Sequence, residues 1–178
     1  MTVLLLCRHA EEGNGAQIEL LADSLAPVEL DAVYTSPLLR AARTAEAVAA
    51  RHELRPIEVP DLREIDLGDV AGLDFDAYPP ELQQTLLDAP GAARFPGGES
   101  YDELQSRVCA ALDDVLAAHR SSTVAVITHA GPIRVALAKW LGIEADASFR
   151  IDQRFAAVNV VEWNDGVPLV RLVNGTRP

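Results

Sequence analysis

The sequence predicts an α/β fold: a three-layer α/β/α sandwich with a mostly parallel central sheet and an antiparallel edge strand. Two observations indicate this class. Apolar runs of strand length alternate along the chain with segments whose apolar residues recur at helical spacing. Near the C-terminus, two strand-like segments (156–163 and 167–173) are separated by Asn164, Asp165 and Gly166, which is typical of a hairpin turn.

The first predicted strand covers residues 3–7, a run of five apolar residues. Apolar residues at helical spacing then predict a helix over 16–25. A short apolar run predicts the second strand over 31–35, and residues 55–60 predict another short extended segment.

The helix after the second strand is predicted to begin at Ser36 and Pro37. A serine followed by proline is typical of an N-cap with proline in the first turn. The alanine-rich sequence that follows predicts a helix to about His52.

The stretch 73–98 contains four prolines and ends in two glycines, so we expect an excursion from the sheet with one short helix near 81–87. Ser100 and Glu103 then form a capping-box pattern, which predicts a helix to about His119.

A buried strand is predicted over residues 123–128. Gly131 and Pro132 lead into a further helix that runs through Leu141. In sheets of this kind, ligands bind beyond the carboxyl ends of the parallel strands. The residues that follow each predicted strand are therefore the first candidates for a site.

Length and composition indicate one globular domain over residues 1–178, with the excursion at about 73–98 lying over the active site. The chain is 49% apolar and has two cysteines, Cys7 and Cys109, neither in a paired metal-ligand spacing. Its formal charge of −12 disfavours nucleic acid and anionic membranes as partners. The sequence contains neither a membrane-span-length apolar run nor a signal-peptide pattern, so we expect a cytoplasmic protein.

Two of the four histidines follow predicted strands in the same way. His9 follows the strand 3–7 and His129 follows the strand 123–128, and each precedes an alanine. If these strands are parallel, both imidazoles emerge on one rim of the sheet. His52 and His119 lie near the ends of predicted helices and are most simply surface residues or helix C-terminal cations.

Two arginines belong to the same rim. Arg8 adjoins His9, and Arg40 lies in the first turn of the helix after the second strand. Guanidinium groups match phosphate oxygens bidentately, and helix N-termini favour anions. Together with the two imidazoles they predict a site for a tetrahedral dianion. The alternative is that Arg8 and Arg40 each pair with one of the chain's 27 acidic residues.

Five spaced motifs resemble the histidine phosphatase superfamily, in its phosphoglycerate mutase-like branch. They follow the family order and span nearly the whole chain. The motifs are "LLCRHAE" with Arg8, His9 and Glu11, "SPLLRAART" with Ser36 and Arg40, "LREIDLGDVAG" with Glu64, "GGES" at residues 97–100, and "VITHAG" around His129.

The resemblance implies a role for each matching residue. His9 is the nucleophile and becomes a phosphohistidine, while Arg8, Arg40 and His129 hold the phosphoryl oxygens. Glu64 donates a proton to the leaving oxygen and then activates water. The resemblance implies neither a metal nor another cofactor, because the cations are built into the protein.

The chain departs from the family pattern at several places. Ala10 and Ala130 replace glycines, although a small residue there still lets the backbone approach the phosphate, and Ala130 is a predicted phosphate contact. If either position needs a positive φ, an alanine there would shift the local geometry. The loop after Glu11 is short, with Glu12 in place of a hydroxyl residue, and Asn14 comes one position early.

The leading hypothesis is a metal-independent phosphatase that hydrolyses a small phosphorylated metabolite, such as an α-ribazole phosphatase-like or broad-specificity enzyme. The compact size favours a phosphatase over a mutase. One alternative is a phosphoprotein phosphatase of the small phosphohistidine type, and another is a catalytically silent phosphate-binding module. The sequence names neither the substrate nor the oligomeric state.

Overall fold

The computed structural model describes residues 1–178, and its elements alternate in the predicted order. The strands are β1 (Thr2–Arg8), β2 (Ala32–Thr35), β3 (Ile57–Glu58), β4 (Thr123–Thr128), β5 (Val158–Asn164) and β6 (Val167–Gly175). The α-helices are α1 (Gly15–Leu25), α2 (Leu39–Ala50), α3 (Pro80–Asp88), α4 (Tyr101–Ala118), α5 (Ala130–Leu141) and α6 (Ala145–Ser148). Short 3₁₀ helices lie at Pro60–Leu62, Gly68–Val70, Phe75–Ala77 and Pro90–Ala92.

One six-stranded sheet runs through the molecule in the order β3-β2-β4-β1-β5-β6. The pairs β2–β3, β2–β4 and β1–β4 are parallel, whereas β5 runs antiparallel to β1 and to β6. Asp165 and Gly166 join β5 to β6 with φ angles of 49° and 84°, the conformation that tight two-residue hairpins favour. The predicted α/β class, with its antiparallel C-terminal edge, is confirmed.

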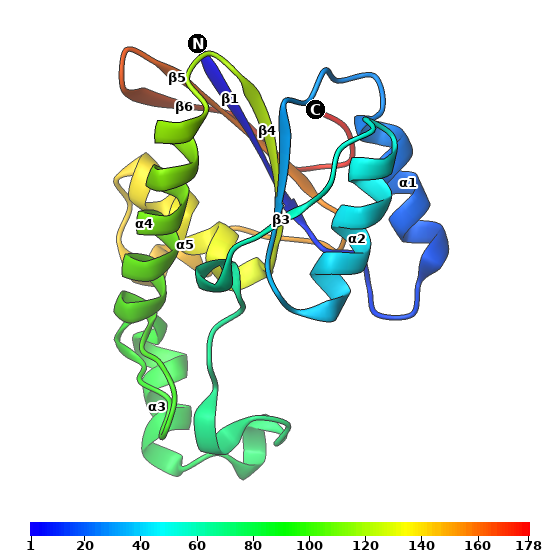
Figure 1. Cartoon of the computed structure of the whole chain (residues 1–178). Helices are drawn as coiled ribbons and strands as arrows, with labels where there is room; N and C mark the ends of the chain where they lie inside the picture. The colour runs from blue at the N-terminus through cyan, green and yellow to red at the C-terminus, as the bar shows by residue number, and fades with distance from the viewer.

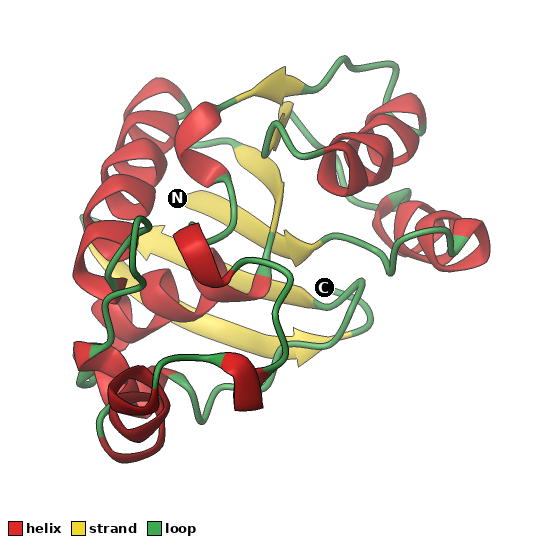
Figure 2. Cartoon of the chain, turned by 90° about the horizontal axis from the view of Figure 1, so that it is seen from below, coloured by secondary structure: helices red, strands yellow, loops and turns green.

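Helices cover both faces of the sheet, which gives the predicted three layers (Figures 1 and 2). Successive side chains of β1 point to opposite faces. Leu4 and Leu6 pack in the core with α4 and α5, while Leu5 and Cys7 pack in the core with α1 and α2. Burial of one such leucine stabilises the fold by about 1.5–3 kcal/mol. Both cores therefore hold β1, and with it the start of the loop that carries His9.

The capping box at the start of α4 is confirmed. Ser100 Oγ accepts a hydrogen bond from the Glu103 N–H, and the Glu103 carboxylate accepts one from the Ser100 N–H. The two reciprocal bonds satisfy backbone donors that the first helical turn leaves free. They fix the point at which the chain returns from the excursion to the main body.

The predicted start of α2 is wrong. The helix begins at Leu39, and its N-cap residue Leu38 makes no side-chain capping bond. Ser36 Oγ lies 2.7 Å from His129 Nε2 and also accepts a hydrogen bond from the Leu38 N–H at 3.3 Å. The Ser36 hydroxyl, which in the sequence resembles a helix cap, is therefore used in a tertiary contact with His129, which follows the neighbouring strand β4.

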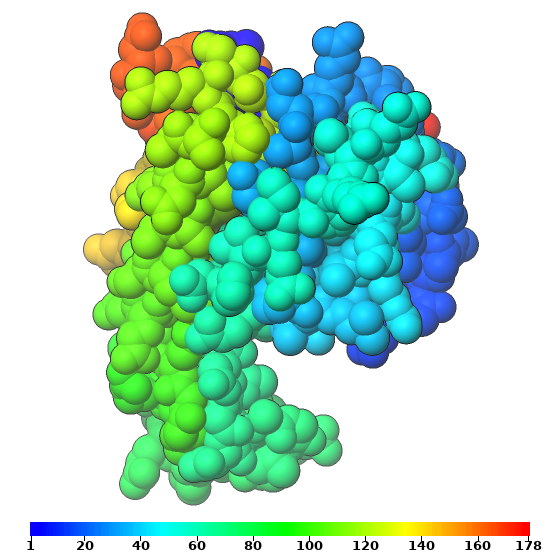
Figure 3. All heavy atoms as spheres, in the orientation of Figure 1, coloured from blue at the N-terminus to red at the C-terminus, as the bar shows by residue number.

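The excursion projects below the sheet in the view of Figure 1, around α3. A small core lies here, made by Leu82, Ala93 and Phe95 of the excursion together with Val70 just before it. In the space-filling view, the surface is hollowed between this projection and the cyan and blue segments above it (Figure 3). The observed helix α3 extends the predicted 81–87 by one residue at each end.

Close backbone packing closes the base of the excursion. A Cβ atom on Gly98 would lie 2.3 Å from the Asp66 carbonyl oxygen and 2.7 Å from the Gly68 nitrogen. Gly68 itself has a φ of +52°, a conformation that side chains disfavour. Both glycines are therefore needed for the segment 66–68 to lie against the segment 96–98.

Replacing Gly98 by alanine tests this packing. Since the added methyl group would overlap backbone atoms that cannot turn aside, we expect Gly98→Ala to lower the free energy of unfolding by about 1–3 kcal/mol. Gly15→Ala is the matched control, because a Cβ there meets nothing within 4 Å. It should leave stability unchanged or raise it by about 0.4–1 kcal/mol. Equal urea midpoints for the two variants would contradict the close packing.

Candidate active site

The two strand-end histidines lie side by side. β1 and β4 are neighbouring parallel strands in which Arg8 pairs with Thr128, so His9 and His129 leave the sheet at the same level. The His9 N–H donates to the Thr128 carbonyl oxygen at 2.9 Å. The two imidazole centroids are 4.9 Å apart, with an edge-to-face angle of 62°.

The hydrogen bonds of His9 determine which of its ring nitrogens carries the proton. Nδ1 lies 2.6 Å from the Ala10 carbonyl oxygen, which can only accept, so Nδ1 is protonated. The free electron pair is then on Nε2, where it accepts a hydrogen bond from Arg40 Nε at 3.2 Å. A neutral imidazole with its electron pair on Nε2 is the form that a nucleophilic histidine needs, once Arg40 turns from that nitrogen to the substrate.

The surroundings of His9 keep its ring neutral. Burial lowers the pKa of His9 to about 4, and the positive charges of Arg40 and Arg8 act in the same direction, against the hydrogen bond to Ala10. Protonation would be complete only well below neutral pH. At neutral pH the Nε2 electron pair is therefore free of a proton.

His129 is fully buried and lies at the N-cap position of α5. Burial lowers the pKa of His129 to about 2, and the positive charges of Arg40 and Arg8 act in the same direction. When Ser36 Oγ donates to Nε2, the ring proton is on Nδ1. Nδ1 is buried and has no protein partner.

Arg8 reaches the same place from the end of β1. Its Nη1 donates to the Gln153 carbonyl oxygen at 2.5 Å, and its guanidinium carbon lies 3.8 Å from the centroid of the Phe155 ring. Burial lowers the pKa of the Arg8 guanidinium, while the negative charge of Glu64 opposes that shift. Nε of Arg8 is buried without a partner.

A buried amide pair lies behind Arg8. Gln153 and Asn159 exchange two hydrogen bonds of 2.8 Å, and Asn159 also donates to the Leu6 carbonyl oxygen. Both side chains are almost completely buried. The pair ties the segment that carries the Gln153 carbonyl to strand β1, and so fixes the orientation of Arg8.

Arg40 comes from the first turn of α2, as predicted. Thr44 Oγ1 donates to the Arg40 carbonyl oxygen and accepts from the Ala10 N–H, which couples this turn to the loop after His9. Neither Arg40 nor Arg8 has a carboxylate within ion-pair distance; the chain's seven ion-pair contacts involve other arginines. The alternative in which both arginines are neutralised by acidic neighbours is therefore wrong.

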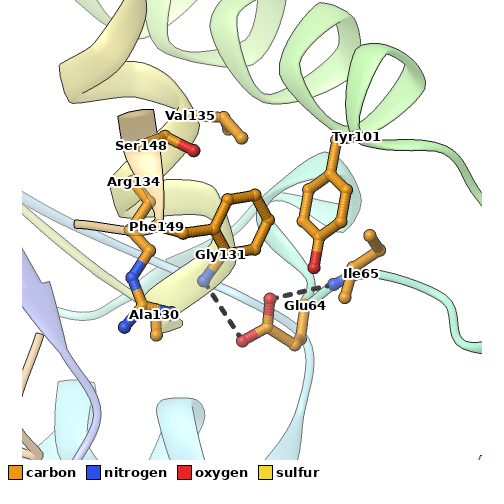
Figure 4. A pocket seen from close by; sticks show the side chains of 9 residues that line it. All are labelled: Glu64, Ile65, Tyr101, Ala130, Gly131, Arg134, Val135, Ser148 and Phe149. Atoms are coloured by element: carbon orange, nitrogen blue, oxygen red, sulfur yellow. Dashed lines mark hydrogen bonds between the residues drawn. The ribbon is translucent and has the colours of Figure 1, made fainter. Parts of the chain in front are cut away.

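Glu64 is fixed by its own backbone surroundings. One carboxylate oxygen accepts from the Ile65 N–H at 3.0 Å, and the other lies 3.4 Å from the Gly131 nitrogen, in the first turn of α5 (Figure 4). Arg107 holds the preceding backbone by donating to the carbonyl oxygens of residues 61, 63 and 64. Glu99 in turn accepts two hydrogen bonds from Arg107, at 2.6 and 2.7 Å.

The departures from the family pattern do not strain the backbone. Neither Ala10 nor Ala130 has a positive φ, so a glycine is not required at either position. Asn14 caps helix α1 by accepting from the Gln17 N–H at 3.1 Å, and its amide donates to Glu11. Asn14 therefore acts as the N-cap of α1 in this structure.

The sequence predicts five of the residues gathered here but not those that orient them. Ser36 resembles a helix cap, whereas it bonds to His129. Phe155 and Gln153 lie far along the chain from Arg8, in a loop with no local signal. Arg107 is one of fourteen arginines, and only its tertiary contacts, with Glu99 and with the backbone of residues 61–64, distinguish it.

No group of three or more histidine, cysteine, aspartate or glutamate side chains is arranged to hold a metal ion. None of the helices combines the length and apolar character that crossing a membrane requires.

Comparisons with known proteins place this geometry in a family. Residues 4–176 match the profile of the histidine phosphatase superfamily (branch 1). Phosphoserine phosphatase 1 of Hydrogenobacter thermophilus is 28% identical over 99% of this chain and 93% of its own length. The bifunctional protein Rv2228c of Mycobacterium tuberculosis is 34% identical over 82% of this chain, which corresponds to 41% of that protein.

Solved structures share the fold. YhfR of Bacillus stearothermophilus superposes with a TM-score of 0.91 at 25% identity, over 98% of both chains. A phosphoserine phosphatase mutant from Entamoeba histolytica, in complex with phosphoserine, superposes with a TM-score of 0.86 at 20% identity, over 99% of this chain and 98% of that one. On the profile match over nearly its whole length, the chain belongs to the histidine phosphatase superfamily, branch 1.

Proposed function

We propose that the protein is a metal-independent phosphatase that hydrolyses a small phosphomonoester through a phosphohistidine on His9. Membership of the superfamily supports the reaction class, a phosphoric monoester hydrolase. Relatives and structural neighbours named phosphoserine phosphatase, and a neighbour described as a putative alpha-ribazole-5'-P phosphatase, support a small phosphorylated metabolite as substrate.

One observation carries the proposal. Three side-chain atoms of the chain are buried without any hydrogen-bond partner, and two of them, Arg8 Nε and His129 Nδ1, belong to this site. Buried donors without a partner are rare, because each loses its hydration without compensation. Together with Arg40, which has no carboxylate partner, they form a set of donors suited to the oxygens of a phosphoryl group.

The first chemical step follows from the tautomer of His9. Its Nε2 electron pair attacks phosphorus, a P–N bond forms, and the P–O bond to the leaving group breaks. Arg8, Arg40 and His129 donate to the equatorial oxygens, and Ala130 lets the start of α5 approach them. Arg40, which donates to Nε2 in the free protein, turns to a phosphoryl oxygen when substrate is bound.

Glu64 serves both steps. In its protonated form it gives the proton that the leaving oxygen needs, and it becomes a carboxylate. That carboxylate then takes a proton from water, whose oxygen attacks phosphorus and breaks the P–N bond. Inorganic phosphate leaves, and both His9 and Glu64 return to their starting states. A braced proton donor is of most use with a poor leaving group, which favours an ester over a phosphoramidate substrate.

Three expectations remain predictions. The excursion 73–98 is expected to lie over the bound substrate, and the hollow beside it in Figure 3 is compatible with that role. Residues 1–178 are expected to form one domain, and the protein is expected to act in the cytoplasm.

Replacing His9 tests the proposed function directly. We expect His9→Ala to lower the turnover of p-nitrophenyl phosphate, measured with EDTA present, by about 10⁴-fold or more, since the nucleophile is lost. The wild-type protein, quenched during turnover, should carry phosphate that is labile in acid and stable in base, and the variant should carry none.

The control for that experiment is His52→Ala. His52 lies beyond the C-terminal end of α2, whereas Arg40 lies in the first turn of that helix. Replacing His52 should therefore change neither the turnover rate nor the amount of phosphoenzyme. Turnover by His9→Ala at the wild-type rate would rule out His9 as the nucleophile. A wild-type protein that binds phosphate but turns nothing over would favour the phosphate-binding module.

Glu64→Gln tests the proton donor. The amide keeps the size and polarity of the side chain but cannot supply the proton. Without that proton, phosphorylation of His9 by an alkyl phosphate should slow by about 10²–10⁴-fold. p-Nitrophenolate leaves without protonation, so phosphorylation of His9 by p-nitrophenyl phosphate should slow far less. Single-turnover measurements with both substrates separate this step from hydrolysis of the phosphoenzyme. Equal slowing on both would mean that Glu64 acts through charge or geometry rather than as an acid.

A further inference from the structure

A pocket of about 120 Å³ opens next to Glu64 (Figure 4). It starts one residue after His129, at Ala130, and extends along α5 toward α6. Its lining residues are Glu64, Ile65, Tyr101, Ala130, Gly131, Arg134, Val135, Ser148 and Phe149. Because the proposed proton donor forms part of its wall, the pocket lies where the leaving group of a phosphoester would be.

Arg134 is the only cation among the lining residues. It lies one helical turn after Ala130 on α5, so the two residues share a face of that helix. Its Nε donates to the Ile151 carbonyl oxygen at 2.9 Å, and this bond orients the guanidinium group. Figure 4 shows that group and the Glu64 carboxylate on either side of Gly131.

The guanidinium group of Arg134 has no carboxylate within ion-pair distance, although the chain carries 27 acidic residues. No protein acceptor is bonded to its two terminal nitrogens. A half-buried guanidinium fork with both terminal nitrogens free is suited to a planar, two-oxygen anion.

Much of the remaining wall is apolar. Tyr101 and Phe149 meet edge to face, with ring centroids 4.7 Å apart and an angle of 84°. Ile65 and Val135 complete this side of the pocket. A volume of about 120 Å³ compares with the roughly 30 Å³ that one water occupies in the liquid. It therefore suits a leaving group of a few non-hydrogen atoms, and a nucleoside would extend out of it.

We propose that Arg134 binds a carboxylate on the leaving group, so that the substrates are small phosphorylated hydroxy acids. This inference rests on the proposed phosphatase function and names its substrate class. A carboxylate fits better than a second phosphate because the pocket holds a single cation, which matches the charge of a monoanion but not that of a dianion.

The test uses two substrates that differ at one carbon. 3-Phosphoglycerate carries a carboxylate where glycerol 3-phosphate carries a CH₂OH group. Wild-type kcat/KM should favour 3-phosphoglycerate. For Arg134→Met, the loss of kcat/KM on 3-phosphoglycerate should exceed the loss on glycerol 3-phosphate by about 10- to 100-fold, the range expected for a hydrogen bond to a charged group. Most of the difference should appear in KM.

Arg150→Met is the matched control, because Arg150 is an exposed arginine just after α6 that does not line the pocket. It should keep the wild-type preference. Equal losses on both substrates in Arg134→Met, or a wild-type enzyme without preference for the carboxylate, would overturn the proposal.

Calorimetry separates this proposal from the phosphatase function itself. In the His9→Ala background, which cannot be phosphorylated, 3-phosphoglycerate should bind more tightly than glycerol 3-phosphate, and Arg134→Met should remove that difference. If p-nitrophenyl phosphate is not hydrolysed but this binding difference is found, the phosphatase function fails and the carboxylate site stands. If hydrolysis is found without the binding difference, the carboxylate site fails alone.

Discussion

The parallel pairing of β1 with β4 is the constraint on which the site depends. It brings together two histidines that are 120 positions apart in the chain, because His9 and His129 each follow the last residue of a paired strand. Strand β1 is anchored in the cores on both faces of the sheet, by Leu4 and Leu6 on one face and by Leu5 and Cys7 on the other. A shift of one residue in this pairing would turn each side chain to the other face. Correct register is therefore required both for the core and for the chemistry.

Burial of basic groups next to each other has a chemical consequence. Removing His9 and His129 from water, beside Arg8 and Arg40, lowers both histidine pKa values far below neutrality. The two arginines stay charged and have no carboxylate partner, while the rest of the chain carries a large excess of negative charge. A phosphoryl dianion compensates the concentration of positive charge at this spot. The same environment keeps the nucleophile neutral and supplies the donors for its substrate.

The sequence predicts the architecture well, because strand lengths, helical spacing and the hairpin turn all depend on neighbours in the chain. It also predicts that His9, His129 and Arg40 share a rim, since parallel strands end at one edge. What it misses depends on contacts between distant segments. Ser36 has a local pattern typical of a cap and a tertiary role beside His129. The contact of Phe155 with Arg8, and the position of Arg134 in the same pocket as Glu64, depend on how loops and helices pack against the sheet.

The proposed mechanism requires that Arg8, Arg40 and His129 bind one phosphoryl group in line with His9. A crystal structure of the protein with orthovanadate, which adopts the geometry of a phosphoryl group in transfer, tests it most directly. We expect vanadium within bonding distance of His9 Nε2, with equatorial oxygens accepting hydrogen bonds from both arginines and from His129 Nδ1. Vanadate bound elsewhere, or bound while Arg40 still donates to His9 Nε2, would contradict it.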